Sequence, residues 1–220
     1  MKKIKIPLIL LIAAVTAFVF VSGCGIGDIA YLDGQGKHII CFGDSLTFGY
    51  GAKPKESYPA QLAKMTSIPV INAGINGDTT PEALKRLETD VLGREPLLVV
   101  IEFGGNDFLT KLPLEETVKN VEEMIKKIQE RKVMVALVDV SYLEPMDGYT
   151  REYKRLSRQY RTIFIPGVMS GIMTSAHLKS DLIHPNAKGY KLIAYRVYRG
   201  IIPSLNHNAL FARSKQPFRQ

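Results

Sequence analysis

Short apolar runs recur along this chain from residue 38 onward. Runs of this length that end at glycine or at polar residues are typical of β-strands covered on both faces. We therefore predict buried strands at residues 38–42, 69–73, 97–103, 133–140 and 162–165.

Between these runs, apolar residues return with helical spacing. Residues 115–131 show it most clearly, with apolar positions every three or four residues, acids in the first turn and bases in the last. The other predicted helices span residues 57–65, 80–90, 148–161 and 186–202. Because parallel strands need crossover connections, the alternation predicts an α/β fold, a single three-layer α/β/α sandwich with about five parallel strands.

The beginning of the chain has a different pattern. A basic start at residues 1–5 is followed by an apolar run at 6–21 and small residues before Cys24. This order predicts a secretory signal peptide over residues 1–23, since the run is short for a membrane span. Residues 21–24, Val-Ser-Gly-Cys, also resemble the lipobox of bacterial lipoproteins, in which the cysteine is lipidated. An ordinary signal peptide and an uncleaved anchor are the alternatives. We expect an exported lipoprotein, anchored to a bacterial membrane and facing the periplasm or the cell exterior.

The remaining chain divides into three parts. Residues 24–37 follow the predicted cleavage point and are rich in glycine and aspartate, a composition that predicts a tether. We expect residues 38–205 to form the folded domain. Residues 206–220 have little pattern and are predicted to form a basic tail. The net charge is +8, and seven lysines and arginines but no acidic residue follow Asp181. This basic end fits either an anionic lipid surface or a solvated helix face with a loose tail.

Cysteine usage and motif content narrow the chemistry. If Cys24 is lipidated, Cys41 has no disulfide partner, and its place in the first apolar run predicts a buried, inert thiol. The sequence contains no cysteine or histidine cluster with metal-ligand spacing and no glycine-rich phosphate loop. We therefore predict no cofactor, no metal and no nucleic-acid partner.

Polar residues follow the first three predicted strands. Ser45, Gly77 and Asn106 each come after an apolar run. Because the carboxyl ends of parallel strands share one edge of the sheet, we expect the three residues to lie close together. Taken singly, a serine here is more often a helix cap, and a glycine or asparagine a turn residue.

An acid and a histidine complete a possible reactive set. A serine hydroxyl needs a base, and the base needs a partner that fixes its tautomer. Asp181 and His184 lie within one turn and can supply both, with His177 as the alternative base. The oxyanion of a tetrahedral intermediate would then be bound by the backbone NH groups of Ser45 and Gly77 and by the side-chain amide of Asn106.

Four motifs now stand in order: GDSL at 43–46, NGDT at 76–79, GGND at 104–107 and DLIHPN at 181–186. In these motifs the chain resembles the SGNH (GDSL) hydrolases, and most closely the bacterial acyl-CoA thioesterase I/lysophospholipase L1/arylesterase branch. The resemblance implies a flavodoxin-like fold, Ser45 as nucleophile, His184 as base and Asp181 as its orienting acid. Thr47 occupies the place of the second glycine in the G-x-S-x-G elbow, which argues against an α/β-hydrolase.

We therefore expect a serine esterase that acts on small acyl esters or thioesters through an acyl-enzyme. Phe108, Leu109 and Leu112 follow the third strand and could bind an acyl chain, or could only fasten loops to helices. A carbohydrate O-deacetylase acting on cell-wall or extracellular polysaccharide is the alternative. A lipoprotein that binds lipid without catalysis is the third possibility. The sequence does not specify an oligomeric state.

Overall fold

The computed structural model describes residues 28–141 and 146–214, with side chains up to residue 209. The predicted signal peptide, the predicted lipidation of Cys24 and the last residues of the predicted tail fall outside these ranges. Five parallel strands form one sheet in the order β2-β1-β3-β4-β5. The strands are β1 (His38–Gly43), β2 (Val70–Gly74), β3 (Pro96–Glu102), β4 (Met134–Val138) and β5 (Ile163–Ile165). The predicted α/β class and the five strands are confirmed, with ends that differ from the prediction by one or two residues.

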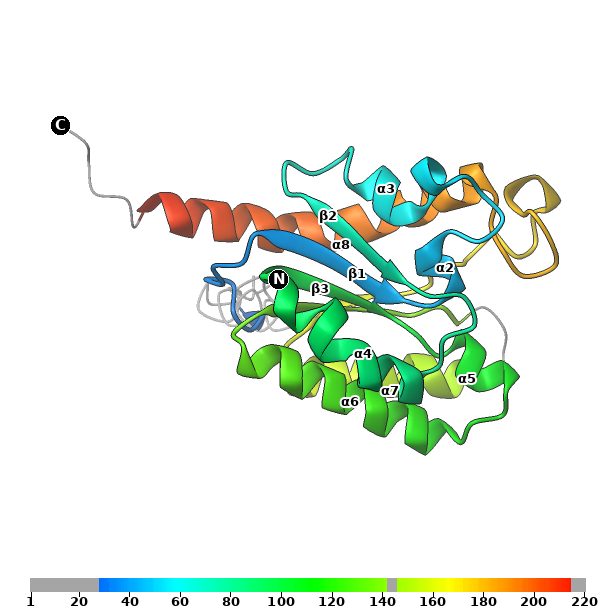
Figure 1. Ribbon diagram of the computed structural model, residues 1–220, viewed down its shortest axis with the longest axis horizontal. Coiled ribbons are helices and arrows are strands. Elements are labelled where there is room, and N and C mark those ends of the chain that lie inside the picture. The colour runs from blue at the N-terminus through cyan, green and yellow to red at the C-terminus, as the bar shows by residue number, and fades with distance from the viewer. Residues whose placement is uncertain (1–27, 142–145, 215–220) are drawn as a thin grey trace, which may run out of the picture.

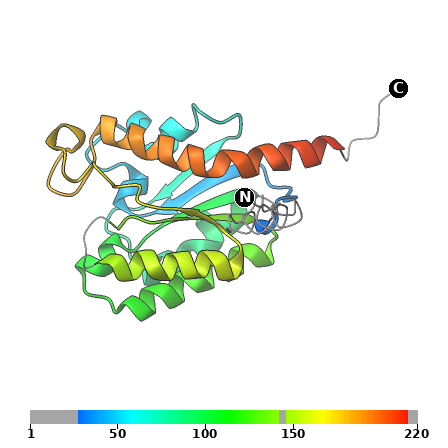
Figure 2. The ribbon, with the colours of Figure 1, turned by 180° about the vertical axis from the view of Figure 1, so that it is seen from behind.

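Helices cover both faces of this sheet, as Figures 1 and 2 show. On one face lie α3 (Tyr58–Leu62) and α8 (Ala187–Ser214), which pack against each other. On the other lie α4 (Thr80–Asp90), α6 (Leu114–Glu130) and α7 (Asp147–Tyr160). Two short helices, α2 (Ser45–Phe48) and α5 (Gly105–Leu109), follow β1 and β3 directly. Three short 3-10 turns also lie in the part of the chain that the structure describes: Pro54–Glu56, Leu92–Arg94 and Ala176–Leu178.

The core is built on the central strands because helices bury both of their faces. Every residue of β3 is buried. The rings of Phe42 and Phe103 pack edge to face, with their centroids 5.1 Å apart. Cys41 lies in this core as a free thiol, and burial raises its pKa to about 12. The predicted buried, unpaired thiol is confirmed.

The predicted tether is wrong for residues 28–37. This segment runs along the amino-end edge of the sheet, where Lys37 N donates to Glu95 O and Ala30 N donates to Arg161 O. Ile29 and Leu32 pack against the core. Apolar side chains and backbone hydrogen bonds thus hold a stretch whose composition is typical of a linker.

The last helix also extends beyond its predicted end at residue 202. α8 continues through Pro203 to Ser214, so the patternless tail begins later than expected. Ser204 and Leu205 are buried, and Asn208 Nδ2 donates to Leu32 O and Gly34 O. These contacts stabilise the helix beyond a proline that removes one hydrogen bond of its ladder. Within the described residues, none of the helices combines the length and the apolarity needed to cross a bilayer.

Candidate active site

The candidate site lies where the strand order reverses. β1 and β3 are neighbours, but their crossover connections run in opposite directions along the sheet, which creates a crevice at their carboxyl ends. Ser45 follows β1 and Asn106 follows β3, so the two residues lie on either side of this crevice. Gly77 follows the adjacent β2, in a turn with a positive φ of 77°.

The turn that carries Ser45 is held by its neighbours. Asp44 caps α2, because its Oδ1 accepts a hydrogen bond from Leu46 N at 2.9 Å. Gly49 ends the helix in the left-handed region, with φ at 94°. Tyr190 of α8 donates its hydroxyl to Tyr50 O at 2.7 Å. Ser45 therefore stands at the start of a short helix fixed at both ends.

Ser45, His184 and Asp181 form a continuous hydrogen-bonded chain. Ser45 Oγ lies 3.0 Å from His184 Nε2, and His184 Nδ1 lies 2.8 Å from Asp181 Oδ2. Asp181 Oδ1 accepts hydrogen bonds from the backbone N of Ile183 and of His184. Partial burial raises the pKa of Asp181, but the hydrogen bonds from His184 and Ile183 outweigh it, so the pKa is lowered. The carboxylate is thus kept ionised beside the imidazole.

The alternative base, His177, is not part of this chain. It is exposed in the turn Ala176–Leu178, where its carbonyl accepts a hydrogen bond from Asn186 Nδ2. It is absent from the residues that line the pocket around Ser45. The structure brings only His184 to the serine.

Asn106 connects the turns after β1 and β2. Its Nδ2 donates to Asp44 Oδ2 at 3.1 Å and to Asp78 O at 3.0 Å. Gly77 precedes Asp78 in this turn, is exposed, and is not among the residues lining the pocket. Both hydrogens of the Asn106 amide are therefore engaged within the protein, a feature that the sequence did not predict.

Two further acids organise these loops. Asp78 binds Arg86 of α4, whose guanidinium also donates to Ala73 O and Gly43 O. Asp107 is fully buried and accepts hydrogen bonds from Thr80 and Thr117. Because Arg86 binds Asp78 as well as Ala73 O and Gly43 O, it links the ends of β1 and β2 to the turn that carries Gly77.

A buried carboxyl group that the sequence analysis missed lies beneath the serine turn. Glu102, the last residue of β3, is 1% exposed, and its Oε2 accepts the Thr47 hydroxyl at 2.7 Å. Burial, and then the charge of Asp44, raise its pKa well above the usual range. Burial also raises the pKa of Asp44 to about 7. The signal for Glu102 was an acid inside an otherwise apolar run.

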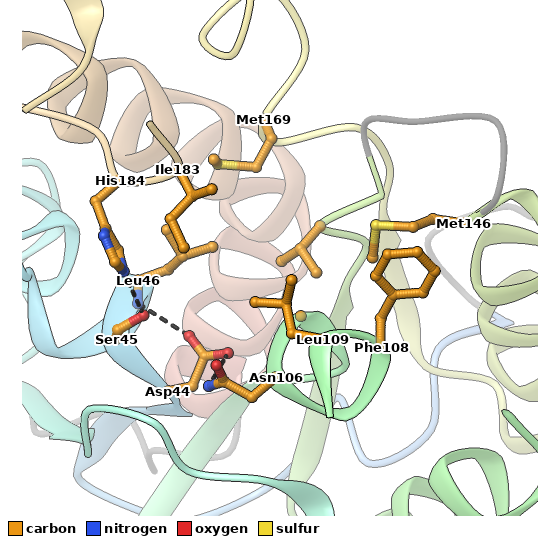
Figure 3. A pocket seen from close by; sticks show the side chains of 12 residues that line it. Asp44, Ser45, Leu46, Asn106, Phe108, Leu109, Met146, Met169, Ile183 and His184 are labelled. Atoms are coloured by element: carbon orange, nitrogen blue, oxygen red, sulfur yellow. Dashed lines mark hydrogen bonds between the residues drawn. The ribbon is translucent and has the colours of Figure 1, made fainter. Parts of the chain in front are cut away.

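An apolar pocket opens beside Ser45 and His184 (Figure 3). Phe108 and Leu109 line it as predicted, whereas Leu112 does not; Leu112 N instead donates to Asp107 O. Met146, which follows the fourth strand, also lines it. Four other lining residues with apolar side chains were not predicted as substrate-binding: Leu46, Val140, Met169 and Ile183.

The pocket shows no sign of a metal centre. In residues 28–141 and 146–214, cysteine, histidine and carboxylate side chains do not form a group of three that could hold a metal ion.

Comparisons with known proteins agree with this geometry. The model of the GDSL-like lipase/acylhydrolase family matches residues 41–192. Thioesterase 1/protease 1/lysophospholipase L1 of Escherichia coli (strain K12) is 25% identical over 179 residues, which cover 78% of this chain and 86% of the relative. Acetylxylan esterase of Geobacillus stearothermophilus is 24% identical over 208 residues, covering 76% of this chain and 95% of the relative.

A solved structure extends the likeness to three dimensions. The psychrotrophic esterase EstA from Pseudoalteromonas sp., inhibited by monoethylphosphonate, is similar with a TM-score of 0.70 and 30% sequence identity. The match covers 77% of this chain and 99% of that chain.

Proposed function

This chain belongs to the GDSL-like lipase/acylhydrolase family, and we propose that it is a serine esterase that cleaves carboxylic esters or thioesters through an acyl-enzyme on Ser45. The observation that carries the proposal is the hydrogen-bonded chain from Ser45 Oγ through His184 to Asp181. It joins a hydroxyl, an imidazole and a carboxylate in the order that nucleophilic catalysis requires.

Each residue of this hydrogen-bonded chain has a defined role in the proposed reaction. As Ser45 Oγ attacks the carbonyl carbon, His184 Nε2 takes its proton, and Asp181 stabilises the imidazolium through Nδ1. The same proton then passes to the departing alcohol or thiol, which leaves an ester on Ser45. Water attacks this ester with His184 as base, and the proton returns to Ser45 as the acid product departs.

The oxyanion requires donors at the same edge of the sheet. We assign this role to the backbone NH groups of Ser45 and Gly77 and to Asn106 Nδ2, where loss of one donor typically costs ~3–4 kcal/mol of transition-state stabilisation. Since Asn106 Nδ2 already donates to Asp44 and to Asp78 O, one of these bonds must be exchanged for the bond to the substrate. Asn106 is thus positioned beforehand, and its donation accompanies substrate binding.

The pocket favours an acyl chain over a polar group. Its lining beside Ser45 includes Phe108, Leu109, Met146 and Met169, whose apolar side chains would bury a short to medium-length chain. The similarity to an acetylxylan esterase supports the second candidate, a carbohydrate O-deacetylase. That enzyme would need only the part of the pocket next to Ser45.

The location of the protein is a separate proposal. The basic and apolar leader with Cys24 supports export and attachment to a membrane through a lipid on that cysteine. The mass of the mature amino terminus tests it: a lipidated Cys24 is the expected result, and an unmodified residue at a nearby cleavage site contradicts it.

Hydrolysis of p-nitrophenyl esters from acetyl to palmitoyl tests the function. We expect turnover that peaks at medium chains, and Ser45→Ala to lower kcat by a factor of at least about 10⁴ because the nucleophile is gone. Ser170→Ala, at an exposed serine outside the pocket, is the matched control and should keep normal turnover.

The outcomes separate the three candidates. Serine-dependent turnover of acetate alone would favour the deacetylase. Normal turnover by Ser45→Ala would refute the mechanism. An absence of turnover with every ester would favour a lipid-binding protein without catalysis.

A further inference from the structure

Asp44 accepts hydrogen bonds from two elements on either side of the crevice. Its Oδ1 accepts from Leu46 N at 2.9 Å and so caps α2, the helix that begins with Ser45. Its Oδ2 accepts from Asn106 Nδ2 at 3.1 Å. Figure 3 shows the carboxyl group between Ser45 and Asn106. One side chain thus joins the helix of the nucleophile to a proposed oxyanion donor.

Capping alone does not require an acid at position 44. Serine and asparagine cap helices about as well as aspartate, each with a single side-chain oxygen. Here two donors converge on one side chain, and an aspartate carboxylate offers two acceptor oxygens and no donor hydrogen. Asp44 is 2% exposed, so bulk water is a poor substitute for either partner. An acid at this position therefore serves the bond to Asn106 as well as the cap.

The two hydrogen bonds from Asn106 Nδ2 differ in their position relative to the pocket. Asp44 and Asn106 both line the pocket beside Ser45. Asp78, whose carbonyl accepts the other hydrogen at 3.0 Å, is not among the lining residues. The hydrogen that Asp44 accepts is therefore the one nearer to the substrate. The bond to Asp78 O can persist while the bond to Asp44 is exchanged.

The surroundings of Asp44 lower the cost of this exchange. Burial raises the pKa of Asp44 to about 7, although the hydrogen bond from Leu46 N acts against it. The charges of Asp107 and Asp78 act in the same direction as burial. A carboxyl group with this pKa can take up a proton near neutral pH. It need not remain as an unpaired buried charge after the amide turns to another acceptor.

We propose that Asp44 is a positioning residue that holds the pocket-side hydrogen of Asn106 in the free enzyme and releases it to the oxyanion during the reaction. Its other oxygen keeps the cap of α2, and with it Ser45, in place throughout. The release rests on the proposed esterase function, but the hold on Asn106 in the free protein requires no hydrolysis.

A double-mutant cycle tests whether Asp44 acts through Asn106. Asp44→Ser keeps an oxygen that can cap α2 but is too short to reach the amide. We expect it to lower kcat for p-nitrophenyl butyrate about tenfold and to change KM by less than about threefold, because the lost effect belongs to the transition state. Asn106→Ala should lower kcat by a factor of about 10² to 10³. Adding Asp44→Ser to Asn106→Ala should lower kcat by less than about a further twofold.

Asp139→Ser is the matched control. Asp139 follows β4, is 3% exposed, and accepts in the same pattern, with Oδ1 from Ser141 N and Oδ2 from Thr150 Oγ1. It is not a lining residue of the pocket. This variant should lower Tm about as much as Asp44→Ser while its kcat stays close to the parent value. Losses that add fully in the double variant, or an equal fall in kcat for Asp139→Ser, would overturn the proposal.

The side-chain amide of Asn106 offers a measurement that needs no turnover. Its two hydrogens give separate NMR signals, which Asn106→Ala identifies by their loss. In the parent both hydrogens should exchange slowly with solvent, and Asp44→Ser should speed this exchange at least about tenfold. Exchange at the parent rate in Asp44→Ser would contradict the hold on Asn106.

Butylboronic acid serves as a probe of the oxyanion. Its boron bonds to Ser45 Oγ, whose proton passes to His184, and the adduct carries a negative tetrahedral centre. We expect the adduct to shift the signal of one Asn106 hydrogen strongly and that of the other only slightly, since the bond to Asp78 O persists. Equal shifts of both signals would refute the selective exchange.

These measurements separate the proposal from the esterase function. A parent that neither hydrolyses esters nor binds butylboronic acid, but whose Asn106 hydrogens are protected by Asp44, would refute the esterase function and leave the hold on Asn106 standing. A parent that hydrolyses esters and keeps full kcat as Asp44→Ser would leave the esterase function standing and overturn the positioning role.

Discussion

At the scale of single residues, burial changes the ionisation of Glu102. An acid at the end of an apolar strand would ordinarily turn to water, yet Glu102 is buried under the serine turn. Its Oε2 binds the Thr47 hydroxyl, while its Oε1 has no hydrogen-bond partner among the described residues. With Asp44 nearby, ionisation of both carboxyl groups would place two charges in the core.

This predicts a pH-dependent effect of Glu102→Gln. Because burial raises the folded-state pKa of Glu102, the folded protein keeps a proton that the unfolded chain loses, and this group's contribution to the free energy of unfolding falls as pH rises. A glutamine at this position has nearly the same shape as Glu102 but does not ionise. Its Tm advantage over the parent should grow by at least about 3 °C between about pH 5 and about pH 8.

Thermal unfolding across this pH range measures the effect. Glu95→Gln is the control, since Glu95 is exposed in its ion pair with Lys37. It should change Tm by a similar small amount at every pH. A Glu102→Gln advantage that shrinks as pH rises would contradict the assignment.

At the scale of elements, the junction of β1 and α2 depends on a glycine. A Cβ added to Gly43 would lie 2.2 Å from Thr47 Oγ1 and 2.5 Å from Glu102 O. The strand end and the helix start therefore approach more closely than any side chain allows. The GDSL motif begins with glycine because the Ser45 turn packs directly on the end of β3.

We predict that Gly43→Ala displaces Ser45 and lowers kcat at least about tenfold, because small shifts of a nucleophile cost much of its reactivity. Hydrolysis of p-nitrophenyl esters measures the loss. Gly93→Ala is the control, because its added Cβ would meet only Glu88 O, at 3.4 Å. Full activity of Gly43→Ala would show that the turn relaxes without moving Ser45.

At the scale of the whole molecule, the carboxyl-end and amino-end edges of the sheet differ in what they contribute. The carboxyl-end edge carries Ser45, His184 and the pocket that they line. The amino-end edge is closed by residues 28–37 and by the far end of α8, which Asn208 joins through two hydrogen bonds to Leu32 O and Gly34 O. The contacts of Asn208 at the amino-end edge are therefore separate from the reactive residues at the carboxyl-end edge.

Asn208→Ala should therefore lower stability without changing catalysis. Loss of two hydrogen bonds to half-buried carbonyls predicts a Tm lower by roughly 3–5 °C. Asn206→Ala, at an exposed position of the same helix, should leave Tm within about 1 °C of the parent value. Thermal unfolding and kcat/KM are measured together, and a fall in kcat/KM for Asn208→Ala would contradict the separation.

The sequence alone determined the five strands, the α/β class and the residues of the hydrogen-bonded chain. A buried parallel strand is a continuous apolar run, and the spacing of Asp181 and His184 within one turn sets their contact locally. Both signals come from neighbouring residues.

Only the tertiary structure decided the strand order, the burial of Glu102, the docking of residues 28–37 and the pocket residues Met169 and Ile183. It also decided that α8 continues beyond Pro203. Each of these features depends on contacts between segments that are far apart in the chain. The free energy of such contacts cannot be predicted from a local sequence pattern.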